Sequence, residues 1–368
     1  MRVLMLLSNP FKPDPRVYEE AQALSEEGYK VTILAWDREL KFPPEERVRG
    51  IRVVRIAVRG GYGKASEFLP GLIRFYIGAL RRSRTLNFDA VHAHDFDTLP
   101  LGIFMARRRK VPLVYDMHDD YGSMIAESVP RPVALSVDLL HRALLRFADS
   151  MIYANDAFRR LFSVHGTVVM NCKDPEDYMV NVEELRRKLG LHDFTVVYIG
   201  IFRQIEFLRM LIEAVKKSEV NLVIGGDGPY REEVLRMIEG EKRIKYIGWV
   251  RAEDIPRYTK LADVIIVLNN PNKRYDRLST PVKVFEAMAA GVPVIVSKGT
   301  AAARIVEQER CGLTVEFGDV DELVEAIKEI KKIGEELGKN GLRAAREKYN
   351  RKAQMQKLKK LYRNLQRL

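Results

Sequence analysis

A single carboxylate, Glu286, stands in an otherwise mostly small and apolar stretch, STPVKVFEAMAAGVPVIVSKG, at residues 279–299. Local rules predict a helix over residues 281–290, because a capping residue, a proline and a terminal glycine occur in the order that a helix favours. These are the N-cap candidates Ser279 and Thr280, then Pro281, and finally Gly291 as the left-handed C-cap.

The start of such a helix exposes unpaired N–H groups and the positive end of the helix dipole, which together bind anions. A carboxylate about a turn and a half further along can accept hydrogen bonds from hydroxyl groups. Phosphate and hydroxyl recognition on one helix suit a nucleotide. The alternative is that Glu286 belongs to the exposed polar face of an ordinary crossover helix.

Short apolar runs alternate with amphipathic stretches along the whole chain. Continuous apolar strands separated by helices indicate parallel sheets covered on both faces. The expected strands form one series at 3–8, 31–36, 51–58, 90–94, 113–118, 151–154 and 168–171, and a second at 196–200, 222–226, 244–249, 264–268, 292–297 and 313–317. Two successive series predict an α/β protein with two Rossmann-like, doubly wound parallel-sheet domains.

A chain of 368 residues is also too long for one ordinary domain. The expected division is an N-terminal domain over 1–172, a C-terminal domain over 173–348 that begins with a linker at 173–193, and a basic helix over 349–368. This last helix is expected to cross back to the N-terminal domain.

The formal net charge of +12 favours an anionic partner, which leaves nucleic acid, an anionic membrane or a phosphorylated small molecule. No recognisable nucleic-acid module accompanies the charge, so nucleic acid is disfavoured. The apolar segment from Phe68 to Leu80 runs into the basic cluster that ends at Arg84 and could lie on an anionic membrane surface. A packed helix with a solvated basic end is the alternative.

No uninterrupted apolar run approaches the roughly 20 residues of a membrane span. The chain starts on the strand-like RVLMLLS without a signal-peptide layout, so a cytoplasmic protein is expected, peripheral to the inner face of a membrane if the basic surface docks there. Cys172 and Cys311 match no metal or redox spacing and are expected to be reduced structural residues.

In open parallel sheets, ligands bind beyond the carboxyl ends of the strands, so the loops that follow strands hold the candidate residues. In the first domain these loops contain Asp14 and Arg16, then His94 and Asp95, and then His118. In the second domain they contain Gly200, Arg203, Gly226, Gly228, Pro229 and the residues that begin the helix of Glu286. His92 and His94 are expected to face opposite sides of their strand, with one of them buried and structural.

Several motifs together resemble the retaining nucleotide-sugar glycosyltransferases of family 4, which have the GT-B fold of two Rossmann-like domains around a cleft. The motifs are DPRVYEEAQALSEEGYKVTILA, DAVHAHD, LVYDMHD, VVMN, YIG, LVIGGDGPYREE and, above all, PVKVFEAMAAGVPVIVS. Their order and spacing cover nearly the whole chain. GDGP alone would be weak.

The resemblance implies that Glu286 binds the ribose hydroxyls of the donor and that the backbone at the start of its helix holds the diphosphate. It also places His118 near the reacting sugar, and the glycine turn under the nucleotide base. The donor-binding set is then Gly200, Arg203, Gly226, Gly228, Pro229, Ser279, Thr280, Pro281, Val282, Lys283 and Glu286. Asp14, Arg16, His94 and Asp95 become acceptor-side candidates, although Asp14 and Arg16 could equally form a loop-stabilising ion pair.

The sequence departs from the family pattern at three single positions, and the glycine pair common after the family's first strand is replaced by Asp14-Pro15-Arg16. The family has a glutamate eight residues before Glu286, where this chain has Leu278, and it has an Arg and a Lys where this chain has Ile201 and Glu206. Asp276 could supply the missing sugar contact. Substitutes for the missing cations are Arg203, Arg209, Arg277 and Lys283.

The resemblance implies a metal-independent transfer with retention, from a UDP- or GDP-linked sugar to a glycan or lipid-linked acceptor, with no cofactor. Two other readings stay open: a nucleotide-sugar epimerase of similar fold, and a non-catalytic relative that binds a partner or a membrane. A dehydrogenase is disfavoured, because SNPFKPDPR after the first strand lacks a G-x-G-x-x-G turn.

Overall fold

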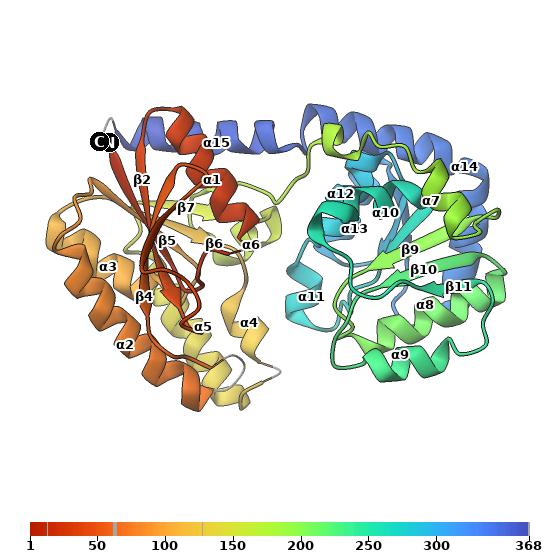
Figure 1. Ribbon diagram of the computed structural model, residues 1–368, viewed down its shortest axis with the longest axis horizontal. Coiled ribbons are helices and arrows are strands. Elements are labelled where there is room, and N and C mark those ends of the chain that lie inside the picture. The colour runs from red at the N-terminus through yellow and green to blue at the C-terminus, as the bar shows by residue number, and fades with distance from the viewer. Residues whose placement is uncertain (13, 62–64, 127, 367–368) are drawn as a thin grey trace. The chain divides into compact units, whose positions relative to one another are not determined.

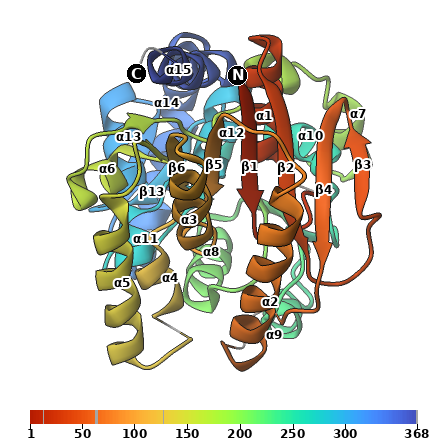
Figure 2. The ribbon, with the colours of Figure 1, turned by 90° about the vertical axis from the view of Figure 1, so that its left-hand side faces the viewer.

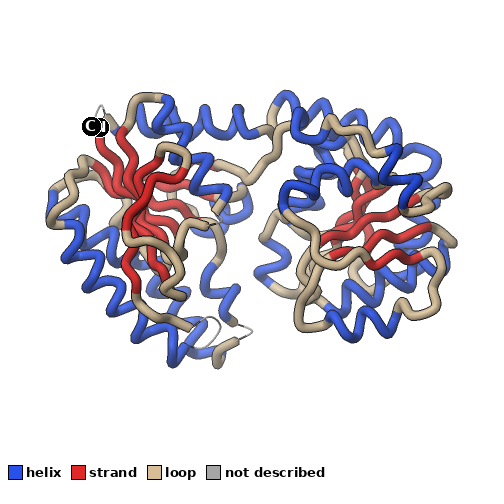
Figure 3. Tube along the Cα trace, viewed as in Figure 1, coloured by secondary structure: helices blue, strands red, loops and turns tan. Residues whose placement is uncertain are grey.

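A computed structural model describes residues 1–368 except 13, 62–64, 127 and 367–368. The chain forms two compact units, one of Met1–Met170 with Gln354–Leu368 and the other of Asn171–Ala353. Each unit contains one sheet covered by helices (Figures 1 and 3). The α/β class with two doubly wound sheets, expected from the two series of apolar strands, is confirmed.

The first unit has an eight-stranded sheet in the order β3-β4-β2-β1-β5-β6-β7-β8. Its strands are β1 (Arg2–Leu7), β2 (Lys30–Asp37), β3 (Glu45–Val48), β4 (Ile51–Ala57), β5 (Ala90–His94), β6 (Leu113–Met117), β7 (Ser150–Tyr153) and β8 (Thr167–Val168). All neighbouring pairs are parallel except β3 with β4.

Strand β3 was missed from the sequence. Its residues EERV contain no apolar run, and their burial alternates between exposed and half-buried. A turn through Arg49 and Gly50, both at positive φ, folds β3 back against β4. This charged edge is typical of strands that must not pair with another sheet.

The helices of the first unit cover opposite faces of the sheet. Helices α1 (Pro15–Glu26) and α15 (Arg351–Leu365) share a core with alternate residues of β1 and β2. Helices α2 (Ala65–Ser83), α3 (Leu99–Arg109) and α5 (Arg131–Leu145) cover the other face (Figure 2). On that face, Trp36 stacks on Phe75 of α2. Two short helices, α4 (Tyr121–Ile125) and α6 (Asp156–Phe162), complete the unit.

The second unit has a six-stranded parallel sheet in the order β11-β10-β9-β12-β13-β14. Its strands are β9 (Thr195–Ile199), β10 (Asn221–Gly225), β11 (Ile244–Tyr246), β12 (Val264–Val267), β13 (Val294–Ser297) and β14 (Gly312–Val315). Its helices are α7 (Glu183–Lys188), α8 (Ile205–Ser218), α9 (Arg231–Met237), α10 (Ile255–Leu261), α11 (Arg274–Leu278), α12 (Val282–Ala290), α13 (Ala301–Glu309) and α14 (Val320–Glu347), with 3₁₀ turns η1 (Pro175–Tyr178) and η2 (Ala252–Asp254).

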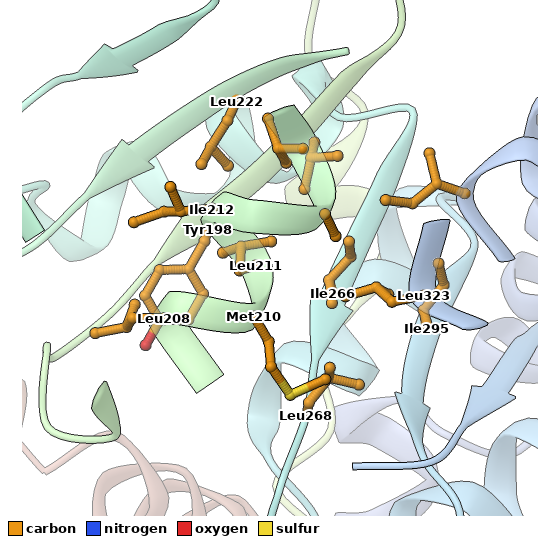
Figure 4. Packing of buried hydrophobic residues seen from close by; sticks show 14 of the residues in the cluster. Tyr198, Leu208, Met210, Leu211, Ile212, Leu222, Ile266, Leu268, Ile295 and Leu323 are labelled. Atoms are coloured by element: carbon orange, nitrogen blue, oxygen red, sulfur yellow. The ribbon is translucent and has the colours of Figure 1, made fainter. Parts of the chain in front are cut away.

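Helices α8 and α14 pack on one face of this sheet. Leu208 and Leu211 of α8, Ile266 of β12 and Leu323 of α14 meet there without solvent exposure (Figure 4). This packing fixes the loops that follow β9 and β12, which are the loops that carry the donor-side candidates. Among the described residues, no helix is both long and apolar enough to span a membrane.

Candidate functional site

Asp116 of β6 is the centre of a buried polar cluster in the first unit. Arg16, in the first turn of α1, donates to it twice, from Nε to Oδ2 at 3.0 Å and from Nη2 to Oδ1 at 2.7 Å. Arg16 also donates to the carbonyl of Val169 at 2.9 Å and lies 3.2 Å from Glu20. Burial opposes the charge of Asp116, but Arg16 and His118 hold its pKa well below the ordinary value.

His118 bridges two carboxylates. Its Nε2 lies 2.8 Å from Oδ2 of Asp116, its Nδ1 lies 3.1 Å from Oδ2 of Asp95, and its backbone N–H donates to Oδ1 of Asp95 at 3.2 Å. Burial alone would lower the pKa of His118, but the two carboxylates raise it well above the ordinary value. The imidazole is therefore a cation near neutral pH, with its ring orientation fixed.

His92 and His94 lie on the same face of β5, and the expectation that they face opposite sides was wrong. Residues two apart in a strand share a face, and here the two rings stack with centroids 4.2 Å apart. Both side chains are fully buried. His94 Nδ1 contacts Asp116 at 3.3 Å and His118 Nε2 at 3.2 Å. The fully buried His94 therefore contacts the half-buried His118 from the interior of the unit.

His92 connects this cluster to the C-terminal helix. Its Nδ1 lies 3.0 Å from the hydroxyl of Tyr362 on α15, and its Nε2 lies 3.8 Å from Glu20. Burial raises the pKa of Glu20 well above the ordinary value, and Asp116 adds to the rise.

Within the described part of the chain, one group of side chains has the donor atoms of a metal site: Glu20, His92, His94 and Asp116, whose ligand atoms lie within 4.8 Å of one another. The guanidinium of Arg16 already supplies a positive charge to both carboxylates of this group. The arrangement therefore fits a neutralised internal network better than a divalent cation.

Asp14 caps helix α1. Its side chain accepts from the N–H of Val17 at 3.1 Å and from Nδ2 of Asn9 at 2.8 Å. Asp14 and Arg16 thus have separate partners, so the loop-stabilising ion pair weighed as an alternative role for them is not formed. Arg16 points into the cluster around Asp116 and is almost completely buried.

Helix α12 of the second unit begins one residue later than expected. Its N-cap is Pro281, which has no side-chain oxygen, so the expectation that Ser279 or Thr280 caps the helix was wrong. Ser279 Oγ instead accepts from Asn269 Nδ2 at 3.0 Å. Gly291 ends the helix in the left-handed conformation, as expected. A helix start without a side-chain cap keeps its N–H groups available to an anion.

Glu286 and Lys283 lie about one turn apart on α12, and both are half-buried. Burial raises the pKa of Glu286, while Lys283 and Lys173 oppose the rise. Burial lowers the pKa of Lys283, Glu286 counteracts this, and Arg203 adds to the lowering. Two lysines therefore act on this carboxylate, and an arginine acts on one of those lysines.

Three glycines allow the loops beside Lys283 to pack closely against each other. A Cβ on Gly200 would lie 3.0 Å from Nζ of Lys283. Gly226 has φ of 134°, and a Cβ there would lie 1.8 Å from the carbonyl oxygen of Gly200. Gly228 has φ of 150° and lies against the backbone of Phe202. Only glycine allows the loops after β9 and β10 to approach this closely.

The three residues of the second unit that depart from the family pattern lie on the surface or at its edge. Ile201 and Glu206 are exposed and Leu278 is half-buried. Asp276 is buried and accepts from Gln204 Nε2 at 3.1 Å, which ties the loop before α8 to α11.

The candidate substitute cations differ in their surroundings. Arg209 is held on the helix surface by Glu233, at 2.5 Å. Arg203 and Arg277 are exposed, and Pro229 of the glycine turn is exposed as well. Arg203 is close enough to Lys283 to influence its pKa.

Sequence reasoning missed Asp116 and Glu20, which organise the first cluster. Asp116 stands within the apolar strand LVYDM two residues before His118, so it had to share a face with the residues that lead to that histidine. An acid inside a buried strand was the available signal. Sequence reasoning also missed Lys173, which opposes the rise in the pKa of Glu286, and Tyr178, whose pKa Glu286 helps to raise. Neither residue stands at a distinctive position in the sequence.

A family model for a glycosyl transferase 4-like domain matches residues 13–170, and one for glycosyl transferases group 1 matches residues 193–332. Solved structures share the whole architecture. Sucrose-phosphate synthase of Thermosynechococcus elongatus has a TM-score of 0.81 at 19% identity, with 99% of both chains covered. HepE of Anabaena in complex with UDP has a TM-score of 0.77 at 19% identity, with 100% of both chains covered.

With its two parallel-sheet units, this chain is a glycosyltransferase of the GT-B fold. Among curated relatives, the alpha-monoglucosyldiacylglycerol synthase of Acholeplasma laidlawii is 25% identical over 365 residues, which cover 91% of this chain and 87% of that protein. The enzyme of the same name from Streptococcus pneumoniae is 26% identical over 273 residues, which cover 67% of this chain and 60% of that protein.

Proposed function

We propose that this glycosyltransferase moves a sugar from a UDP- or GDP-linked donor to a glycan or lipid-linked acceptor, with retention of configuration and without a metal. The observation that carries the proposal is the pair Glu286 and Lys283 at the uncapped start of α12. A carboxylate for ribose hydroxyls and a cation for phosphate stand there within one helical turn. The UDP bound to HepE and the glucosyl lipid in the names of both relatives support the two substrate classes.

On the donor side, Glu286 accepts hydrogen bonds from the ribose. The N–H groups of Val282 and Lys283, with the hydroxyls of Ser279 and Thr280 beside Pro281, receive the diphosphate. Because Gly200, Gly226 and Gly228 bring two backbone loops into contact, they leave a flat surface under the base, next to Pro229. These glycines act through shape and not through a side chain.

The chemistry required of the second unit is stabilisation of the leaving diphosphate. As the bond from the anomeric carbon to the phosphate oxygen breaks, negative charge grows on that oxygen. Lys283, Arg203 and the helix start provide fixed positive charge for it, which substitutes for a divalent ion. The acceptor hydroxyl attacks from the face that the diphosphate leaves, and its proton passes to the departing phosphate oxygen, so configuration is retained.

On the acceptor side, His118 contacts the reacting sugar as a cation held by Asp95 and Asp116. Asp95 is half-buried and can accept a hydrogen bond from the acceptor. His94 and Arg16 act as positioning residues, since both are buried and both bind Asp116. Asp14 keeps α1 in place through its cap.

We further propose that the helical face of α2 and α5 docks on the inner face of an anionic membrane, where a lipid-linked acceptor would be found. On α2, Leu69, Ile73 and Ile77 recur every four residues and are 55%, 59% and 45% exposed. On α5, Leu135 and Leu139 are 62% and 67% exposed. Apolar stripes at helical spacing beside arginines are typical of interfacial helices.

A thermal-shift panel with UDP, GDP, ADP, TDP and CMP tests the donor assignment. We expect one diphosphate to stabilise the wild type equally with and without a divalent metal, and we expect Glu286→Ala to lose the effect. A ligand at about 100 times its dissociation constant stabilises by roughly 2.7 kcal/mol, which is readily measured. If no nucleotide stabilises the wild type, the donor assignment is wrong.

The same samples separate the two other readings. A non-catalytic relative would bind no diphosphate and would be indifferent to Glu286→Ala. An epimerase would convert a nucleotide sugar with no acceptor present. Neither is favoured by the matches to glycosyltransferase domains across both units.

A further inference from the structure

A cavity opens at the carboxyl end of the first sheet, away from the histidine cluster. It has a volume of ≈ 460 Å³ and lies between the loops after β2 and β4 and the beginning of α2. Three of its lining residues are arginines: Arg38, Arg59 and Arg74. Two glutamates, Glu39 and Glu67, also line it, so the lining charge is +3 − 2 = +1.

Two of the arginines are available to a ligand. Arg59 and Arg74 are exposed, and neither forms an ion pair or side-chain hydrogen bond with any residue that the structure describes. Glu39, by contrast, pairs with Lys41. Like charges in a shared concavity repel each other, and an anion between them would relieve that repulsion.

The third arginine forms the base of the cavity. Arg38 lies over the ring of Trp36, with Cζ 4.4 Å from the centroid, and its Nη2 lies 3.6 Å from Asp97. Gly60 and Gly71 lie edge-on against the same ring, since a Cβ on either would come within 2.5 Å or 2.8 Å of Trp36 Cζ2. Three residues that line the cavity are therefore packed against one buried aromatic ring.

We propose that this cavity binds a phosphate-class anionic group of the acceptor, at the end opposite the reacting hydroxyl. Guanidinium groups match the oxygens of phosphate in two-point hydrogen bonds, which suits Arg59 and Arg74. The inference rests on the proposed function, because it gives the acceptor of that reaction a defined chemistry.

The separation between the cavity and His118 determines how long such an acceptor must be. The cavity follows β2 and β4, whereas His118 follows β6, and the order β2-β1-β5-β6 separates them by three strand spacings. The loop after β4 lies one spacing further away. Strands lie about 4.8 Å apart, so the anionic group and the reacting hydroxyl are roughly 14 to 19 Å apart. Asp97, directly after β5, joins the two ends through Arg38.

The anionic group can come from a soluble phosphorylated glycan or from a lipid headgroup. Ile73 and Ile77 flank Arg74 on the exposed face of α2, so the cavity borders the surface proposed to meet a membrane. Both sources present the same phosphate oxygens to the arginines.

Trp36 is a natural reporter of this cavity. The chain has two tryptophans, and the other is Trp249 of the second unit, so Trp249→Phe leaves Trp36 as the only indole emitter. In this background, inorganic phosphate, glycerol 1-phosphate, and vesicles of phosphatidylglycerol or of phosphatidylcholine are titrated. Line broadening of the ³¹P signal of inorganic phosphate, with excess UDP present, is the second readout.

The test variant carries Arg59→Gln and Arg74→Gln. The control carries Arg108→Gln and Arg236→Gln, which remove two exposed arginines that do not line the cavity. We expect phosphate or glycerol phosphate to give a saturable response whose dissociation constant rises at least tenfold in the test variant and less than twofold in the control. A response to phosphatidylglycerol vesicles alone, with the same dependence on Arg59 and Arg74, assigns the site to a lipid headgroup.

The inference is overturned if neither readout responds to any of these probes, or if the control weakens binding as much as the test variant. Nucleotide stabilisation, measured on the same proteins, keeps the two proposals apart. A protein that binds a diphosphate nucleotide but no phosphate here contradicts only the inference. One that binds phosphate here but no nucleotide contradicts only the donor assignment.

Discussion

Arg16 and Asp116, one hundred residues apart in the chain, are joined by two hydrogen bonds of 3.0 and 2.7 Å inside the first unit. The pair connects the start of α1 to the end of β6. Because Asp116 also contacts His118 at 2.8 Å, the position of the histidine depends on the arginine. The ion pair is thus both a structural element and the support of the candidate acceptor site.

Replacing Arg16 by Met should lower the free energy of unfolding by about 3 to 5 kcal/mol, because it leaves the buried Asp116 without its counterion. Urea denaturation measures the loss. The control is Arg2→Met, which removes an exposed ion pair with Asp89 and should cost less than about 1 kcal/mol. Equal losses in the free energy of unfolding would contradict the prediction that the buried pair stabilises the fold more than the exposed pair does.

His118 should contribute stability that depends on pH. Its folded pKa is raised above the unfolded value of about 6.5, since Asp95 and Asp116 outweigh burial. Its protonation therefore stabilises the folded state fully below about pH 6.5, and the contribution is lost as pH rises through the folded pKa. The difference in unfolding free energy between wild type and His118→Gln should shrink on the alkaline side, and a difference that grows there would contradict this.

Gly226→Ala should destabilise the second unit and abolish nucleotide stabilisation. The new Cβ would overlap the carbonyl oxygen of Gly200, at 1.8 Å, in addition to the cost of positive φ. Gly240→Ala is the control, because Gly240 has φ of 77° with nothing within 4 Å of a Cβ and should cost about 1 kcal/mol. The idea fails if Gly226→Ala loses no more stability than the control and still binds nucleotide.

Lys283→Gln should lower kcat by roughly 100-fold or more, as expected when a fixed charge at a leaving group is removed. Burial lowers the pKa of Lys283. Activity should therefore decline, as pH rises, at a lower pH than an ordinary lysine would allow, and this alkaline limb should disappear in Lys283→Arg. Steady-state rates measured across pH test both statements. An unchanged alkaline limb in Lys283→Arg would exclude Lys283 as its source.

Membrane docking should require both the apolar stripe and the arginines of the first unit. Leu135→Ser with Leu139→Ser on α5, and separately Arg81→Glu with Arg84→Glu, should each reduce binding to phosphatidylglycerol vesicles at least tenfold in co-sedimentation. Arg82 is left in place, because it pairs with Glu45 at 2.7 Å and its reversal would place two negative charges side by side.

The control for docking is Met179→Ser, which removes an exposed apolar side chain of the second unit. It should bind vesicles like the wild type. The docking proposal is wrong if neither the leucine variant nor the arginine variant weakens vesicle binding. It is also wrong if Met179→Ser weakens binding as much as they do.

The expected strands reappear in the structure to within one or two residues, except that β8 and β11 each end three residues earlier than expected. The reason is that each parallel strand is a short apolar run bounded by polar residues, as in VVYIG or NLVIG. Strand β3 differs from the others, because its residues are mostly charged. They pair with β4 only because the turn at Arg49 and Gly50 places the two segments side by side. Its formation depends on a neighbour and not on its own pattern.

The candidate site residues also divide into those with a local signal in the sequence and those without one. Glu286, His118 and the glycine loops were singled out as candidates because each stands at a position that a helix start or a strand end makes distinctive. The cap of α12 was misassigned, because Ser279 is held by Asn269 and the helix begins beyond it. His92 and His94 were placed on opposite faces although the strand period of two puts them on one.

The sequence by itself determined the α/β class, the two series of strands, and the loops in which chemistry could occur, because periodicity and turn residues act over a few neighbouring positions. Only the tertiary structure decided which polar groups meet. Arg16 reaches Asp116, Tyr362 reaches His92, and the arginines of the loops after β2 and β4 share a cavity with α2. Such pairings depend on strand order and on which face a helix covers, and neither is encoded by local pattern.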